Sequence, residues 1–193
     1  MNVIIRSTSF LLEGNPLWDK LTKNIKVSFS TYNDLFSNYP KKKFDFEVLL
    51  IFSRDILDEF SINQKTQKNK LNQIVKGIES RARLNNDTKY LIFFSSYYFN
   101  SLSENIKSNL SNNFKKIFSD KIYKSSNKNN NIYYIDIDNF FSEIGFNICF
   151  DSRNFYHLRC PLSLDGLEVF INSIKNTIKN IKLPKKKVLL LDC

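Results

Sequence analysis

The sequence predicts an α/β domain built on a doubly wound, mostly parallel sheet of about five strands. Short apolar runs alternate with longer amphipathic segments, which is the pattern of a parallel sheet covered by helices. Hydrophobic residues make up 42% of the 193 residues, so the chain can bury a core of its own. Only four glycines and four prolines are present, which argues against a turn-rich β-sandwich.

Five apolar runs are expected to form the strands of this sheet, at residues 3–7, 26–30, 47–52, 90–95 and 132–137. The third run is the most strongly apolar of them. A sixth run, at residues 187–191, is also expected to be a strand. The segment 125–131, rich in Asn, Lys and Ser, is expected to be the loop before the fifth strand.

Four helices are expected around the strands, at residues 16–25, 64–84, 101–118 and 167–181. Asn15 can cap the first helix, because Pro16 then takes the first helical position. Ser101 and Glu104 have the spacing of a capping box at the start of the third. The second and fourth carry apolar side chains at helical spacing, namely Leu71, Ile74, Val75 and Ile78, and Val169, Phe170, Ile174 and Ile178.

The formal net charge of +10 raises the question of a nucleic-acid partner. The excess is nearly all lysine, and it is scattered except for short clusters at 41–43 and 185–187. No arginine-rich stripe or aromatic stacking motif accompanies these lysines. We therefore expect solvated lysines and no nucleic-acid partner.

The cysteines indicate a reducing compartment. Cys149, Cys160 and Cys193 form neither a Cys-x-x-Cys pair nor a metal-binding spacing. The first residues lack the pattern of a signal peptide, and no apolar stretch is as long as a membrane span. We expect a cytoplasmic protein without a membrane partner.

The last residues of the sequence form an apolar run that delivers Asp192 at its carboxyl end. Ligands of α/β sheets bind outside the carboxyl ends of strands, so this aspartate could serve chemistry. The alternative is a terminal edge strand followed by an incidental aspartate. The spacing alone favours that alternative.

Two segments resemble the FkbH-like proteins, which belong to subfamily IIIC of the haloacid-dehalogenase (HAD) superfamily. The run FDSRNFYHLRCPLS at 150–163 is similar to a stretch that precedes a helix and a Lys-rich strand in that family. The run KKKVLLLDC at 185–193 is similar to the start of the first HAD motif. YNDLF at 32–36, and DID at 136–138 followed by Gly145, are weaker similarities. The resemblance covers most of the chain.

The resemblance implies an SGNH-like amino-terminal domain at residues 1–184, a flavodoxin-like three-layer sandwich. It also implies that residues 185–193 are the first strand of a truncated HAD-type phosphotransferase or phosphatase domain. Asp192 would then be the HAD nucleophile and a ligand of Mg²⁺, together with a second aspartate two residues on. The full-length parent would be active and the present fragment inactive.

A second segment also looks like a HAD motif but is expected to be structural. Asp136 and Asp138 follow an apolar run and precede Asn139, while Phe140 stands where a hydroxyl residue is expected. About fifty residues follow, too few for the remaining parts of a HAD domain. We expect a strand end with an aspartate that caps a helix.

The resemblance to SGNH hydrolases implies a serine nucleophile, a histidine base, and oxyanion donors from backbone, Gly and Asn. Ser7 (or Ser9) follows the first strand, and His157 is the one histidine of the chain. The glycine expected after the second strand is missing, and Ser53-Arg54-Asp55 stands where Gly-x-Asn-Asp would be expected. Asp151 and His157 are six residues apart rather than three; alternatively, Cys160-Pro161 occupies the place of the usual His-Pro.

These departures favour a non-catalytic or degenerate SGNH-like domain. His157 is then expected to be a partly buried, hydrogen-bonded ring, and Ser7 a strand-end hydroxyl. Arg54 and Arg153, with Asp151 beside them, are the candidate binding residues, because a guanidinium pairs with phosphate or carboxylate at two points. The alternative is an active SGNH-type esterase or acyltransferase that uses Ser7 and His157.

The partners implied by the resemblance are a covalently linked HAD domain, an acyl carrier protein and a phosphorylated three-carbon donor. The pathway implied is polyketide or surface-glycan assembly. Mg²⁺ is the cofactor of the HAD domain, and none is expected for the SGNH-like domain. The domain would position the donor or the carrier for phosphoryl or glyceryl transfer.

Overall fold

The computed structural model describes residues 1–22, 25–36, 43–56, 64–97 and 104–183. Five strands form one sheet: β1 (Asn2–Ser7), β2 (Lys26–Phe29), β3 (Phe46–Phe52), β4 (Lys89–Ser95) and β5 (Ile132–Asp136). Their order across the sheet is β2-β1-β3-β4-β5, and every neighbouring pair is parallel. The predicted α/β class with a parallel sheet of about five strands is confirmed.

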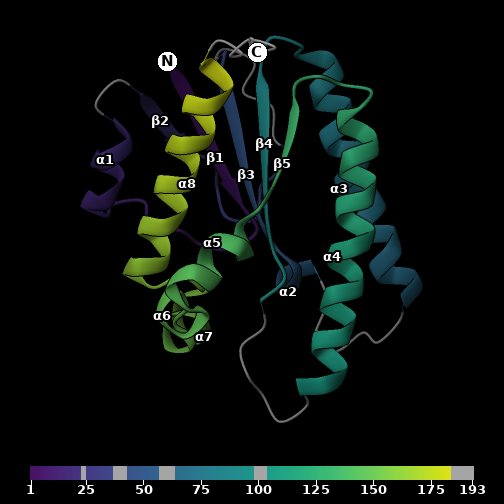
Figure 1. The fold of residues 1–193 in the computed structure, drawn as a ribbon, viewed down its shortest axis with the longest axis vertical. Coiled ribbons are helices and arrows are strands. Elements are labelled where there is room, and N and C mark those ends of the chain that lie inside the picture. The colour runs from purple at the N-terminus through teal and green to yellow at the C-terminus, as the bar shows by residue number, and fades with distance from the viewer. Residues whose placement is uncertain (23–24, 37–42, 57–63, 98–103, 184–193) are drawn as a thin grey trace, which may run out of the picture.

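Helices cover both faces of the sheet, and this makes three layers (Figure 1). One face carries η1 (Pro16–Trp18), α1 (Asp19–Thr22), α5 (Ile137–Ile144) and α8 (Leu164–Lys182), and the other carries α3 (Gln64–Leu84) and α4 (Glu104–Ser126). The short helices α2 (Ser53–Ile56), α6 (Phe146–Cys149) and α7 (Ser152–Leu158) lie near the carboxyl ends of the strands.

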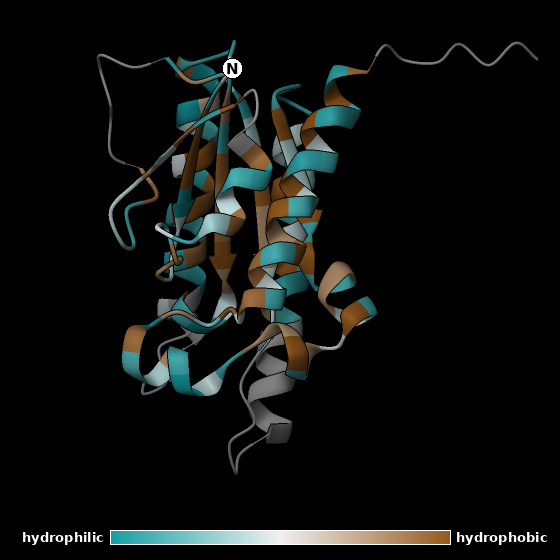
Figure 2. Cartoon of the chain, turned by 90° about the vertical axis from the view of Figure 1, so that its left-hand side faces the viewer, coloured by the Kyte–Doolittle hydropathy of each residue, from teal (hydrophilic) through white to brown (hydrophobic). Residues whose placement is uncertain are grey.

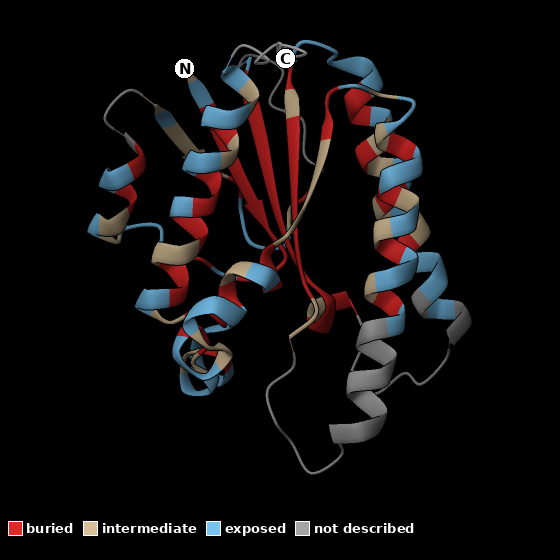
Figure 3. Cartoon of the chain, viewed as in Figure 1, coloured by how far each residue is buried: buried red, intermediate tan, exposed pale blue. Residues whose placement is uncertain are grey.

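Each face of the sheet has its own apolar core. In β3, Val48, Leu50 and Phe52 join the cluster under α8, whereas Leu49 and Ile51 join the cluster under α3 and α4. This alternation follows from the period of two in a strand, and a strand covered on both sides must be apolar throughout. Figure 2 shows the apolar strands between helices whose outer faces are hydrophilic, and Figure 3 shows the strands as the buried centre.

Several element boundaries differ from the predicted ones. The helix expected at 16–25 is a 3₁₀ turn followed by a four-residue helix, although Asn15 caps it as predicted, with its Oδ1 2.9 Å from the Leu17 N–H. Helix α4 continues to Ser126, beyond the predicted end at 118, because Ile122 extends the buried stripe of Phe114 and Phe118. The expected loop at 125–131 therefore begins later.

The region between β5 and α8 contains three helices that the apolar pattern did not predict. Asp136 caps α5 by accepting the Asp138 N–H at 3.2 Å, as predicted for this strand end. Helix α8 begins at Leu164, three residues before the predicted start, because Ser163 caps it. The capping box at Ser101, the strand at 187–191 and the proposed domain boundary at 184/185 lie outside the described residues.

A buried ionic network lies between the sheet and α3. The Arg6 Nε donates to Glu47 Oε2 at 3.1 Å, and the Arg81 Nη2 donates to Glu47 Oε1 at 2.8 Å. Arg6 is fully buried and Glu47 almost so, and burial lowers the Arg6 pKa against the opposing effect of Glu47. Buried charges cost roughly several kcal/mol unless they are paired. The Glu47 carboxylate pairs with both guanidinium groups, and Asp34 lies 3.8 Å from the Arg6 Nη1.

We predict that Glu47→Ala lowers the free energy of unfolding by about 3–5 kcal/mol, because it leaves two buried guanidinium groups without their shared carboxylate. Urea unfolding measures this change. Glu168→Ala is the matched control, because its ion pair with Lys20 is nearly half exposed and such pairs contribute about 1 kcal/mol or less. Equal losses in the two variants would contradict the assigned role of Glu47.

The start of α8 is packed tightly against α6. The Ser163 Oγ donates to the Ile148 carbonyl at 2.6 Å and accepts the Gly166 N–H at 3.0 Å. A Cβ atom on Gly166 would lie 2.0 Å from the backbone oxygen of Cys149. Only glycine therefore allows the two helices to approach this closely.

We predict that Gly166→Ala destabilises the domain by at least about 1–3 kcal/mol, because a backbone atom must move to remove the overlap. Gly14→Ala is the control, since nothing lies within 4 Å of a Cβ atom at that position, and its effect is expected to stay within about 0.5 kcal/mol. Thermal unfolding of both variants gives the comparison. A Gly166→Ala protein as stable as the original would refute the close approach of α6 and α8.

Candidate functional site

The strand order places a topological switch point between β1 and β3. The chain leaves β1 toward β2 on one side of it, whereas β3, β4 and β5 follow on the other side. Ligands of open α/β sheets bind outside the carboxyl ends of the strands at this point. The residues there are Ser7 at the end of β1, Thr8 and Ser9 directly after it, and Ser53, Arg54 and Asp55 after β3.

Asp55 ties the two strand ends together. Its Oδ2 accepts the hydroxyl of Thr8 at 2.7 Å and that of Ser9 at 2.6 Å. Burial raises the pKa of the Asp55 carboxyl, while the two hydroxyl groups and the charges of Arg54 and Arg159 oppose that rise. The hydroxyl groups of Thr8 and Ser9 therefore donate to a half-buried carboxylate.

The backbone N–H groups after β1 are all engaged. Thr8 donates to the Leu50 carbonyl at 3.1 Å, Ser9 to the Ser7 Oγ at 3.1 Å, and Phe10 to the Arg159 carbonyl at 3.0 Å. An oxyanion hole needs N–H groups that point at a reacting oxygen. None of these three is available for that purpose in this arrangement.

Helix α7 lies at the same edge and carries most of the other predicted site residues. Asp151 caps it by accepting the N–H groups of Arg153 and Asn154 at 2.8 and 3.1 Å. The Arg54 guanidinium lies 3.8 Å from the centre of the Phe155 ring, a cation–π contact that joins α2 to α7. The Arg153 side chain is exposed.

Among the described residues, His157 forms no hydrogen bond with Ser7 or Ser9. The imidazole lies in the last turn of α7 and is exposed. The prediction that the His157 ring is partly buried is therefore wrong. Within the described part of the chain the imidazole has no hydrogen-bond partner, whereas the Ser7 Oγ accepts the Ser9 N–H. Cys160, at the alternative histidine position, is a buried thiol whose pKa burial raises, and its Sγ lies 3.8 Å from the Leu162 carbonyl.

Two hollows of different size flank the strand ends. A pit beside Ser7, Ser9, Phe10 and Tyr32 has a volume of about 10 Å³, room for a single water molecule. A cleft of about 620 Å³ lies on the other side, next to Thr8 and Asp55. Of these two hollows, the cleft is the one large enough for an organic ligand.

A second polar cluster lies at the ends of β4 and β5. Asp138 accepts the hydroxyls of Ser95 and Ser96, both at 2.6 Å, and Lys115 Nζ lies 3.0 Å from Asp138 and 2.8 Å from Asp136. The two aspartates that look like a HAD motif thus bind a lysine. Among the described residues, no group of three or more His, Cys, Asp or Glu side chains could hold a metal ion. Asp192, the implied Mg²⁺ ligand, lies outside them.

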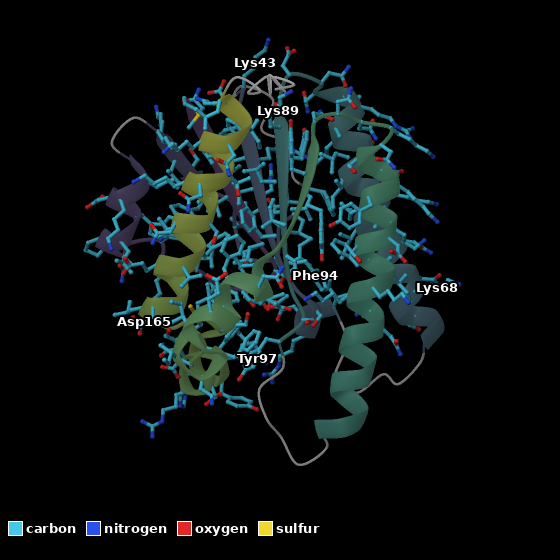
Figure 4. The ribbon with its side chains drawn as sticks, in the orientation of Figure 1. Lys43, Lys68, Lys89, Phe94, Tyr97 and Asp165 are labelled. Carbon is cyan, nitrogen blue, oxygen red and sulfur yellow. The ribbon has the colours of Figure 1, made fainter. Side chains whose placement is uncertain are left out.

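An aromatic group closes this end of the sheet beyond β4. Tyr97, labelled in Figure 4, stacks on Phe146 with ring centres 5.0 Å apart, and its ring lies 4.2 Å from that of Phe150. Lys89, the first residue of β4, lies at the opposite end of this strand in the same view. The aromatic rings of Tyr97, Phe146 and Phe150 therefore pack together beside the end of β4.

Sequence reasoning missed Asp55, Thr8 and Lys115 as members of these clusters. The motif at Ser53-Arg54-Asp55 gave a partial signal, because it follows an apolar strand. The partners of Asp55 depend on β1 and β3 being neighbours, and strand order is not encoded in a local pattern. Lys115 lies on α4, a helix whose contact with β5 has no motif in the sequence.

No protein-family model matches the sequence, and no curated protein matches it. The fold is similar to a solved one. It matches the crystal structure of the amino-terminal part of a Bacteroides fragilis protein, which contains a phosphatase domain and is complexed with Mg. The TM-score is 0.69 at 14% sequence identity, and the match covers 94% of this chain and 52% of the other.

The chain thus spans about half the length of this neighbour. At this level of identity the likeness shows a shared α/β fold. None of the helices in the described part of the chain is both long enough and apolar enough to cross a membrane.

The raised pKa of Asp55 predicts a pH dependence of stability. The folded protein holds this proton more tightly than the unfolded chain, whose aspartate has a pKa near 3.8. Protonation therefore stabilises the fold, and the contribution of Asp55 declines as the pH rises above that value. We expect the unfolding free energy of the protein, minus that of Asp55→Asn, to fall from about pH 4 toward neutrality.

Urea unfolding at a series of pH values measures this difference. Asp87→Asn removes an exposed carboxylate and controls for the change in net charge. A difference that grows with pH would mean that the fold lowers the pKa of Asp55, and would contradict the assignment.

Proposed function

We propose that this chain is the amino-terminal, SGNH-like domain of an FkbH-like protein, and that it binds rather than catalyses. In the larger protein it would position a phosphorylated three-carbon donor or an acyl carrier protein for a HAD-type domain. The shared fold with the amino-terminal part of a phosphatase-domain protein supports this proposal. The sequence similarities at 150–163 and 185–193 point the same way.

The observation that carries the proposal is the engagement of every catalytic candidate after β1. A serine hydrolase needs a hydroxyl that a base can deprotonate and donors for the oxyanion. Here the Ser9 hydroxyl donates to Asp55, the Ser7 Oγ accepts a backbone N–H, and the N–H groups of 8–10 have other acceptors. The loss of one oxyanion donor alone costs a factor of about 10²–10³ in rate.

In this proposal, the residues of α2 and α7 at the carboxyl ends of the strands bind a ligand or a partner. Arg54 stands against the Phe155 ring, and Arg153 and His157 are exposed on α7. The exposed guanidinium of Arg153 suits a phosphate or carboxylate that arrives from solvent, whereas Arg54 is buried. Phosphoryl chemistry would be performed by the HAD-type domain, with Asp192 as nucleophile and Mg²⁺ as its cofactor.

We predict that the chain does not hydrolyse short acyl esters above the buffer rate. Ser7→Ala, Ser9→Ala and His157→Ala should leave any background unchanged, because none of these side chains is part of an assembled dyad. Release of p-nitrophenol from its acetate and butyrate esters measures the rate. Turnover that disappears in a serine variant and in His157→Ala would establish the alternative, an active esterase.

The proposed link to a HAD-type domain is tested by the gene sequence that follows the codon for Cys193. We expect an acidic residue at the second position after Asp192, followed closely by a hydroxyl residue, because these complete the motif that Asp192 begins in the resembled family. Sequencing of the genomic locus checks this. A stop codon directly after the codon for Cys193 would contradict the proposed parent protein.

A further inference from the structure

The cleft of about 620 Å³ lies on the α3 side of the switch point. Its floor and walls come from four separate parts of the chain: the end of β1, the turn after β2, helix α2 and helix α3. The described lining residues are Thr8, Asn33, Asp34, Leu35, Phe36, Asp55, Ile56, Lys70, Gln73 and Ile74. Its volume falls within the range of roughly 300–1,000 Å³ that small-molecule sites occupy.

One part of the lining is apolar. Leu35 and Ile56 are buried beneath it, and Phe36 and Ile74 are half-buried at its sides. These side chains belong to the cluster under α3 and α4, so the apolar wall is continuous with the core. Such a wall favours a ligand that has a hydrocarbon body.

The two carboxylates of the lining already have partners. Asp34 lies 3.8 Å from the Arg6 Nη1, and its Oδ1 accepts the Phe36 N–H at 3.2 Å. Asp55 accepts the Thr8 and Ser9 hydroxyls, with Arg54 and Arg159 close enough to act on its charge. Neither carboxylate therefore presents an uncompensated negative charge to the cleft.

Lys70 supplies the positive charge among the described lining residues, and its side chain is exposed. Gln73 lies one helical turn further along α3, on the same side of that helix, and Asn33 also lines the cleft. An ammonium group and two amides can together bind a carboxylate. These three side chains are exposed, whereas Leu35 and Ile56 are buried.

We propose that this cleft binds a small organic anion with a short hydrocarbon body, whose carboxylate lies at Lys70 and whose carbon chain lies against Leu35 and Ile56. This ligand class extends the proposed function and rests on it in one respect only, namely that this edge binds rather than hydrolyses. The esterase assay tests that point separately, so the two ideas can fail independently.

The experiment uses three probes of equal length: hexanoate, hexanol and hexylamine. Each is titrated into the ¹⁵N-labelled protein while amide chemical shifts are followed. We expect saturable shifts at residues 33–36, 56 and 70–74, with hexanoate binding more tightly than hexanol and hexanol more tightly than hexylamine. Lys70→Gln should weaken hexanoate binding by about two- to fivefold, as for loss of one exposed ion pair, and should leave hexanol binding unchanged.

Lys68→Gln is the matched control, because Lys68 is an exposed lysine of the same helix that is absent from the described lining (Figure 4). Its hexanoate affinity should equal that of the original protein. A preference for hexylamine would overturn the proposal in favour of a cation site. Equal affinity for all three probes, equal effects of the two lysine variants, or shifts that fall elsewhere would overturn it as well.

Discussion

The shared carboxylate of Glu47 is the constraint on which the rest of the structure depends. It lies in the first half of β3 and joins Arg6 of β1 to Arg81 of α3. The same two arginines reach the turn after β2, since Arg6 contacts Asp34 and the Arg81 Nη1 donates to the Phe36 carbonyl at 2.9 Å. One buried ionic group therefore fixes two strands, a helix and one wall of the cleft.

The polar residues at the carboxyl ends of β1 and β3 have structural roles, although a hydrolase would use residues of these types for catalysis. Hydroxyl groups after a first parallel strand, a carboxylate after the third and a histidine on a late helix are the parts of a hydrolase. In this protein the hydroxyls bind the carboxylate, and α7 turns its histidine toward solvent. Arg159 ends α7 in a left-handed conformation, and its carbonyl takes the Phe10 N–H. The contact that closes α7 over β1 thus removes a donor that catalysis would need.

The sequence was sufficient for the sheet, because five buried parallel strands must be apolar on both faces and such runs stand out. The caps at Asn15 and Asp136 were also predictable, because capping is a local interaction between residues two apart. The group around Asp55 was not. Its partners are 46 and 47 residues away, and they meet only because β1 lies beside β3. Likewise, α4 extends to Ser126 because Ile122 is buried in the core. The polar composition of residues 119–126 does not indicate this.

The position of Arg6 has a consequence for the order of folding during synthesis. Arg6 leaves the ribosome among the first residues, yet its carboxylate partner follows 41 residues later, and Arg81 later still. Until β3 brings Glu47 beside β1, the buried Arg6 guanidinium lacks its closest carboxylate partner. The pairing of Arg6 with Glu47 is non-local, so it forms only after the entropy cost of closing the loop between them has been met. We therefore expect the nascent amino terminus to stay open until β3 has been made.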